Sequence, residues 1–231
     1  MNRFISQMRA LLGQSLRVEW ASPERFLSPL LFAITVLVLF SFALGEIDGP
    51  DAAKLIVAET FLTAFFALQI SFSRSLDPDM QDRVFDVLRT YPISPTAWFI
   101  SKYVLVMIMG SLILLPTMAL SSFFYAKSGV SMLSTPLITI AMTALAGMAV
   151  LGVLLTTMTM RSGSKQILYP LLYFPLTTPV LLSAVESSKA VLIDNESLSA
   201  LSSSWLGLLI IFGIIYFTLG LLLFGELVKA E

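Results

Sequence analysis

The sequence predicts an all-α, polytopic membrane protein, and the first reason is its composition. Of the 231 residues, 57% are hydrophobic and only 13% are charged, and the mean hydropathy is +0.88. Several apolar runs exceed the roughly 20 residues that a helix needs to cross the hydrocarbon core of a bilayer. Six transmembrane helices are therefore expected, at residues 27–44, 53–73, 98–124, 134–159, 165–186 and 204–226. Because the connections between them are short, residues 1–231 are predicted to form a single transmembrane domain.

The segment before the first span is predicted to form an interfacial helix over residues 4–16. One face of this helix would be hydrophobic, with Phe4, Ile5, Met8, Leu11 and Leu12. The opposite face would carry Arg3, Gln7 and Gln14. This pattern is typical of a helix that lies in the headgroup layer, and a mobile leader is the alternative. The basic stretch is too long for a typical signal peptide, so we expect the segment to be retained.

The distribution of lysine and arginine predicts the orientation of the chain in the membrane. Eleven of these residues lie in the N-terminal segment, in or beside the connections after the second and fourth spans, and at the C-terminus. The other three connections contain one each, namely Lys54, Lys127 and Lys189. Because cytoplasmic connections carry the excess of positive charge, both termini are expected to be cytoplasmic.

Two missing residue types exclude several kinds of chemistry. The sequence contains no cysteine and no histidine, which excludes thiolate and imidazole metal ligands and a Ser-His-Asp relay. It also contains no GxxxxGK[ST] phosphate-binding loop, so any ATP must be hydrolysed by a separate chain. The sequence has no basic tail that could bind a polyanion, so it does not indicate a nucleic-acid partner. We therefore predict a chain that is not an enzyme and that binds no cofactor or metal itself.

The connection after the second span is predicted to contain a short amphipathic helix, in the segment DPDMQDRVFDVLRTYP at residues 77–92. Asp77 and Pro78 are typical of a helix start, and Pro92 ends the segment. The apolar face would contain Met80, Val84, Val87, Leu88 and Tyr91, and Phe85 would lie apart from both faces. The polar face would contain Asp79, Asp82, Arg83, Asp86 and Arg89.

This amphipathic helix could rest on the lipid surface or dock into a partner protein. Helices that rest on anionic lipid usually have a polar face rich in lysine and arginine, whereas here three acidic residues face two basic ones. The pattern therefore favours docking. The residues expected to contact the partner are Met80, Val84, Phe85, Val87, Leu88 and Arg89.

Three stretches of the chain resemble the haem exporter protein B (CcmB) family. They are SRSLDPDMQDRVFDVL at residues 73–88, TYPISPTAWFISKYV at 90–104 and FPLTTPVLLSAVESS at 174–188. The order of an interfacial helix, six spans and a cytoplasmic helix after span two also resembles the permease subunits of ABC-2-type ABC transporters. Arg83 departs from the resemblance, because a small residue is expected there.

The resemblance implies a permease subunit in the bacterial inner membrane that acts in cytochrome c maturation. It implies as partners an ATP-binding subunit (CcmA-like), a second copy of the chain, haem-handling membrane subunits and a periplasmic haem chaperone. The partner would bind ATP, and haem would be the transported or handled species. ATP would drive either haem export or release of the loaded chaperone, and the lack of histidine favours release. The alternatives are an ABC-2-type permease that exports a glycan, lipid or drug, and a small secondary transporter or channel.

The predicted fifth span contains three prolines, in YPLLYFPLTTPVLL at residues 169–182. Each interior proline removes a backbone donor. In a bilayer such a break is tolerated only beside protein or a water-filled cavity, so the prolines are expected to face one of these. We predict a discontinuous helix that flexes when the partner binds ATP, with a structural kink as the alternative. The predicted hinge consists of Pro170, Pro175, Thr177, Thr178 and Pro179.

Overall fold

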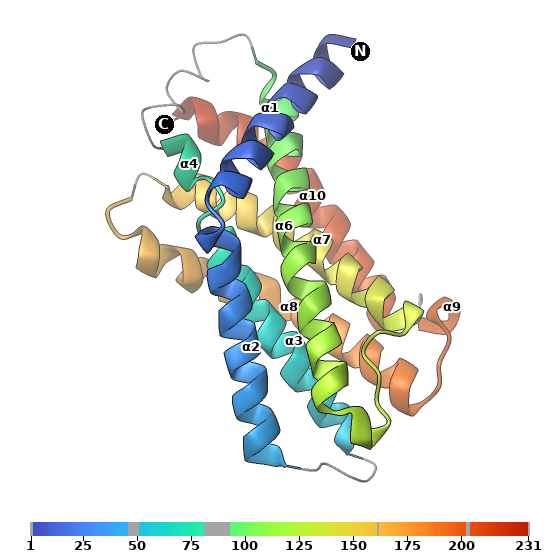
Figure 1. Cartoon of the computed structure of the whole chain (residues 1–231). Coiled ribbons are helices and arrows are strands. Elements are labelled where there is room, and N and C mark those ends of the chain that lie inside the picture. Colours follow the sequence, from blue (N-terminus) through green and yellow to red (C-terminus); the bar gives the residue numbers. More distant parts are fainter. Residues whose placement is uncertain (1, 46–50, 81–92, 161, 202–203, 231) are drawn as a thin grey trace.

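A computed structural model describes residues 2–45, 51–80, 93–160, 162–201 and 204–230 (Figure 1). These residues form helices and connections and include no strand. The helices are α1 (Asn2–Ala21), α2 (Glu24–Leu44), α3 (Ala52–Phe72), α4 (Asp77–Met80), α6 (Pro95–Phe124), the 3-10 helix η2 (Ala126–Ser128), α7 (Thr135–Thr159), α8 (Lys165–Ile193), α9 (Leu198–Leu201) and α10 (Trp205–Ala230).

Six of these helices are long and apolar enough to cross a membrane, namely α2, α3, α6, α7, α8 and α10. They coincide with the six predicted spans, so the predicted fold class is confirmed. Both chain termini lie at the same end of the helix bundle, and α4 lies near them (Figure 1). We call this end the terminal end and the other the opposite end.

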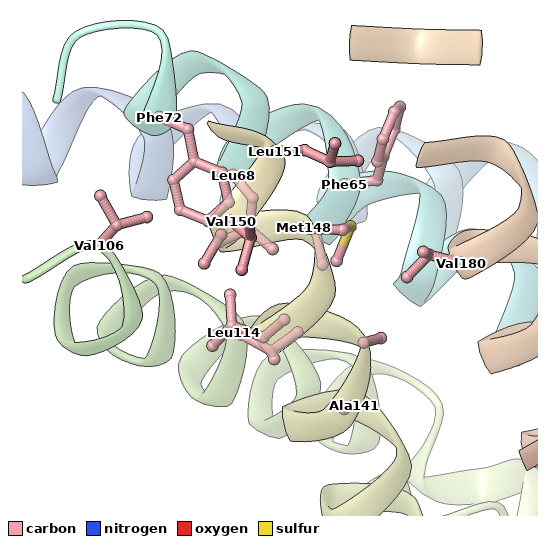
Figure 2. Close-up of a cluster of buried hydrophobic side chains, with 14 of the residues drawn as sticks. Phe65, Leu68, Phe72, Val106, Leu114, Ala141, Met148, Val150, Leu151 and Val180 are labelled. Carbon is pink, nitrogen blue, oxygen red and sulfur yellow. The ribbon is translucent and has the colours of Figure 1, made fainter. Parts of the chain in front are cut away.

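Helix α7 forms the centre of the bundle. It packs against α3, α6, α8 and α10, and it is the most deeply buried of the six long helices. Small residues make this close packing possible: Ala141, Ala144, Gly147, Ala149 and Gly152 are all buried. Figure 2 shows Phe65, Leu68 and Phe72 of α3 meeting side chains of α6 and α7 in the resulting core.

Helix α1 is longer than the predicted interfacial helix, since it covers Asn2–Ala21 rather than residues 4–16. It packs against α6, and Leu11 of the predicted hydrophobic face is buried. Ile5, on the same predicted face, is exposed. Part of the predicted hydrophobic face therefore contacts protein.

Helix α8 differs from the prediction in two ways. It extends to Ile193 rather than to residue 186, and it is a continuous α-helix through all three prolines. The predicted discontinuity is therefore wrong. The hydroxyl groups of Thr177 and Thr178 donate to the carbonyl groups of Tyr173 and Phe174 respectively, each at 2.7 Å. These side-chain hydrogen bonds supplement the backbone ladder where the prolines weaken it.

Candidate functional site

The last residue of α3, Phe72, is held against α7, and this fixes where the following chain begins. The hydroxyl group of Thr156 donates to the backbone carbonyl of Phe72 at 2.9 Å. One turn earlier on α7, Gly152 leaves room for the Phe72 ring, because a Cβ atom at that position would lie 2.9 Å from it. Two turn hydrogen bonds, from Asp77 N to Arg74 O and from Asp79 N to Leu76 O, then lead into α4. The local fold thus places Asp77 and Asp79 at defined positions just beyond α3.

Asp79 forms a buried ion pair with Lys102 of α6. The Nζ atom of Lys102 lies 2.9 Å from Oδ1 and 2.7 Å from Oδ2 of Asp79, and the two residues are 3% and 8% exposed. Lys102 also donates to Oγ of Ser15, on α1, at 3.0 Å. Because charges attract more strongly away from water, and each is costly to leave unpaired there, this pair is expected to hold α1, α4 and α6 together.

Asp77 forms a second interhelical ion pair, with Lys165 at the first position of α8. The two side chains are partly exposed, so solvent screens the attraction and the contact is weaker than the buried pair. Two carboxylates only two residues apart therefore connect the end of α3 to different helices. Asp79 reaches α6, and Asp77 reaches the helix that contains the prolines.

A third charged contact joins α1 to α2 in the same region. The guanidinium of Arg25 lies 3.7 Å from the carboxylate of Glu19. Burial raises the pKa of Glu19, while the positive charges of Arg25 and Lys102 act in the opposite direction. The terminal end thus contains a cluster of opposite charges contributed by α1, α2, α4, α6 and α8.

The structure corrects one prediction about the docking segment and leaves the rest open. Asp79 was expected on the exposed polar face, but it is buried, because Lys102 pairs with it. Without Asp79 the predicted polar face has two acidic residues, Asp82 and Asp86, against two basic ones, so docking is favoured only by the lack of a basic excess. The backbone of Met80 ends α4. Its side chain lies outside the described residues, as do the other predicted contacts, Val84, Phe85, Val87, Leu88 and Arg89.

The predicted hinge residues lie on different faces of α8. Thr177 is buried, Thr178 is exposed, and Pro170 and Pro179 are half-buried. Pro175 is exposed, so the expectation that all three prolines face protein or a cavity is wrong for Pro175 in the single chain. Tyr216 of α10 donates to the Leu176 carbonyl at 2.6 Å and ties α10 to this part of the helix.

Two side-chain hydrogen bonds connect α3 with α6 and the residue after it at the opposite end. The phenol group of Tyr125, which follows α6, donates to Oε2 of the buried Glu59 at 2.5 Å. The next residue of α3, Thr60, shares a hydrogen bond with Ser121 of α6, also at 2.5 Å. The sequence indicates Glu59 as a rare intramembrane acid, but its partner 66 residues away could not be predicted from spacing.

The described residues include no group of three or more acidic side chains that could hold a metal ion. No match to the chain was found among curated proteins. A family model described as CcmB protein matches residues 6–225, which include five of the membrane-spanning helices, most of α10, and the segment with Asp77 and Asp79. The chain therefore belongs to the CcmB protein family, and it is a permease component of the haem-export system used in cytochrome c maturation.

Proposed function

We propose that this chain converts ATP hydrolysis by a separate subunit into movement of its membrane helices during haem delivery. One observation supports this most directly: Asp77 and Asp79 connect the start of the predicted docking segment to α8 and α6. Movement of that segment would therefore be transmitted to the bundle through two ion pairs.

The proposed mechanism begins at the docking segment. The ATP-binding subunit contacts Met80, Val84, Phe85, Val87, Leu88 and Arg89 and displaces them when it binds or releases nucleotide. The Asp79–Lys102 pair is buried, so pulling it apart would leave two uncompensated charges. We expect α4, α6 and α1 to move together for that reason. The Asp77–Lys165 pair is more exposed and passes the displacement on to α8.

Helix α8 is the element proposed to bend in response. Each of its three prolines removes one backbone hydrogen bond, and helices commonly kink where such bonds are missing. Pro170, Pro175 and Pro179, with the hydroxyl groups of Thr177 and Thr178, form the proposed hinge. Its bending would drive haem export or the release of a haem-loaded periplasmic chaperone. The absence of histidine favours release, because the chain lacks the commonest axial ligand of haem.

The surroundings of the chain belong to the same proposal. Residues 1–231 act as one permease domain in the bacterial inner membrane, with both termini in the cytoplasm and α1 beside the headgroup layer. The partners are a CcmA-like ATP-binding subunit, a second copy of the chain, haem-handling membrane subunits and the periplasmic haem chaperone. This orientation agrees with the excess of lysine and arginine on one side of the membrane.

Two variants separate docking from transmission. We expect Leu88→Asp to abolish co-purification with the ATP-binding subunit, because it places a charge on the proposed apolar contact face. Lys165→Gln should still co-purify with the ATP-binding subunit. In the complex, however, its rates of ATP hydrolysis and chaperone release should fall about tenfold, a loss of coupling typical of a linked site. Both rates are measured on the complex reconstituted in nanodiscs.

Lys54→Gln is the matched control, because Lys54 also pairs with a nearby carboxylate, Asp51, but at the opposite end. Wild-type rates are expected for this variant. Wild-type rates for Lys165→Gln, or an equal loss in both lysine variants, would refute transmission through Asp77 and Lys165. Normal co-purification of Leu88→Asp would refute the docking assignment.

A further inference from the structure

An open cavity of about 460 Å³ lies between the end of α3 and the start of α8. Neither Asp79 nor Lys102 lines it. Most of its lining residues are polar, and the full set is Gln69, Ser73, Arg74, Asp77, Lys165, Gln166, Tyr169 and Pro170. A space of this size at the end of two membrane-spanning helices is large enough to hold a ligand group.

The charges around this cavity favour an anion. Lys165 is already paired with Asp77, which also lines the cavity. Arg74 is exposed and has no ion-pair partner within the described part of the chain. The lining therefore has an excess positive charge, with the amide groups of Gln69 and Gln166 as further hydrogen-bond donors. A guanidinium can donate two parallel hydrogen bonds to a carboxylate or phosphate, so it suits an acid group best.

An aromatic surface continues from the cavity along both helices. Phe66 lies two turns before Ser73 on α3, and Phe174 lies one turn after Pro170 on α8, each on the same helical face as its cavity residue. The two rings meet edge to face with their centroids 5.8 Å apart. They are 36% and 37% exposed. The cationic cavity is thus followed by an apolar surface about 10 Å further along α3 and about 6 Å further along α8.

We propose that this site binds an anionic amphiphile, with its acid group in the cavity beside Arg74 and its apolar body over Phe66 and Phe174. Two ligands share that chemistry: haem, with its propionate carboxylates, and an anionic phospholipid, with its phosphate. The haem source rests on the proposed function, which makes haem the cargo and places this end at the cytoplasmic membrane surface. A bound acid group would compete with Asp77 for Lys165. Ligand binding would therefore weaken the Asp77–Lys165 ion pair, which is the pair proposed to transmit movement to α8.

The test uses the full chain alone in nanodiscs, without the ATP-binding subunit. Haemin is titrated and followed by absorbance, and retained phosphatidylglycerol is compared with phosphatidylcholine by native mass spectrometry. We expect Arg74→Gln to weaken binding of one of these acids about tenfold, the scale of a charge-assisted contact. Arg74→Lys should lose less, because it keeps the charge but not the paired donors. Arg17→Gln, an exposed arginine of α1 that lies outside the cavity, is the matched control.

Weaker haemin binding with unchanged phosphatidylglycerol retention would identify the propionate groups as the ligand, and the reverse would identify the lipid phosphate. Wild-type binding of both by Arg74→Gln, or an equal loss in Arg17→Gln, would overturn the proposal. Because no ATP-binding subunit is present, failure here would leave the coupling proposal intact. Conversely, failure of the Lys165→Gln experiment would leave this site untouched.

Discussion

The two ends of the helix bundle are held together by different chemistry. At the terminal end, ion pairs join different helices: Asp79 to Lys102, Asp77 to Lys165 and Glu19 to Arg25. At the opposite end, the ion pairs of the described residues join side chains three positions apart, in Asp51–Lys54 and Glu186–Lys189. Contacts between α3 and α6 there are made by uncharged donors, Tyr125 to Glu59 and Thr60 with Ser121.

This difference indicates how the two ends respond to force. An interhelical ion pair that is shielded from water keeps its helices together when one is displaced, because separation exposes two charges to a poorly screening medium. A hydrogen bond from a hydroxyl or phenol contributes about 1 kcal/mol net, so it is easier to break and re-form. The terminal end is therefore suited to receive a displacement, and the opposite end is suited to open.

The largest expected effect comes from breaking the buried ion pair at the terminal end. Lys102→Met removes one partner and leaves Asp79 buried with an uncompensated charge. We expect the free energy of unfolding in mixed micelles to fall by about 3–5 kcal/mol. Lys189→Met, which breaks a partly exposed pair at the opposite end, should cost less than about 1 kcal/mol.

A double variant strengthens this test. Combining Lys102→Met with Asp79→Leu removes both charges, so much of the lost stability should return. Equal costs for Lys102→Met and Lys189→Met would contradict the contrast between the two ends. No recovery in the double variant would mean that packing, rather than charge, accounts for the loss.

An intermediate effect is expected from the hydrogen bond between Tyr125 and Glu59 at the opposite end. Tyr125→Phe removes the donor and leaves the Oε2 atom of Glu59 buried without its partner. The unfolding free energy should fall by about 1–3 kcal/mol, the cost of an unsatisfied buried polar atom. Combining it with Glu59→Leu should recover part of this loss. A fully stable Tyr125→Phe protein would show that the contact holds neither helix in place.

The smallest effect on stability is expected from the prolines of α8, although they should affect coupling. Pro175→Ala together with Pro179→Ala restores two backbone donors in a helix that is already continuous. We expect the unfolding free energy to change by less than about 1 kcal/mol, while stimulated ATP hydrolysis and chaperone release decrease because the helix is stiffer. Pro116→Ala, in α6, is the matched control. Wild-type coupling in the double proline variant would leave the prolines with a structural role alone.

The membrane spans could be predicted because hydropathy depends on the composition of a window of about 20 residues, and long apolar runs in water have few alternatives. The end of α8 was harder. The fifth span was predicted to end at Glu186, yet the helix continues to Ile193. Lys189 pairs with Glu186 within the helix, and Ser188 donates to the Ala184 carbonyl. These polar side chains are therefore satisfied locally and do not terminate the helix.

The interhelical ion pairs could not be predicted, because they depend on tertiary structure. Asp79 and Lys102 are 23 residues apart, and Asp77 and Lys165 are 88 apart, so no helical period connects either pair. A helical wheel treats residues 77–92 as an isolated helix, and this placed Asp79 on a solvent-facing surface. The visible signal was only that Lys102 is a charged residue inside an apolar run.

The contact between Phe72 and α7 has a mechanical consequence. Because Thr156 holds the carbonyl group and Gly152 accommodates the ring, α3 cannot slide along α7 without losing both interactions. A push on residues 77–80 is therefore expected to rotate that short stretch about Phe72 as a fulcrum. Through this rotation, a small movement of the ATP-binding subunit would tilt two helices in opposite directions.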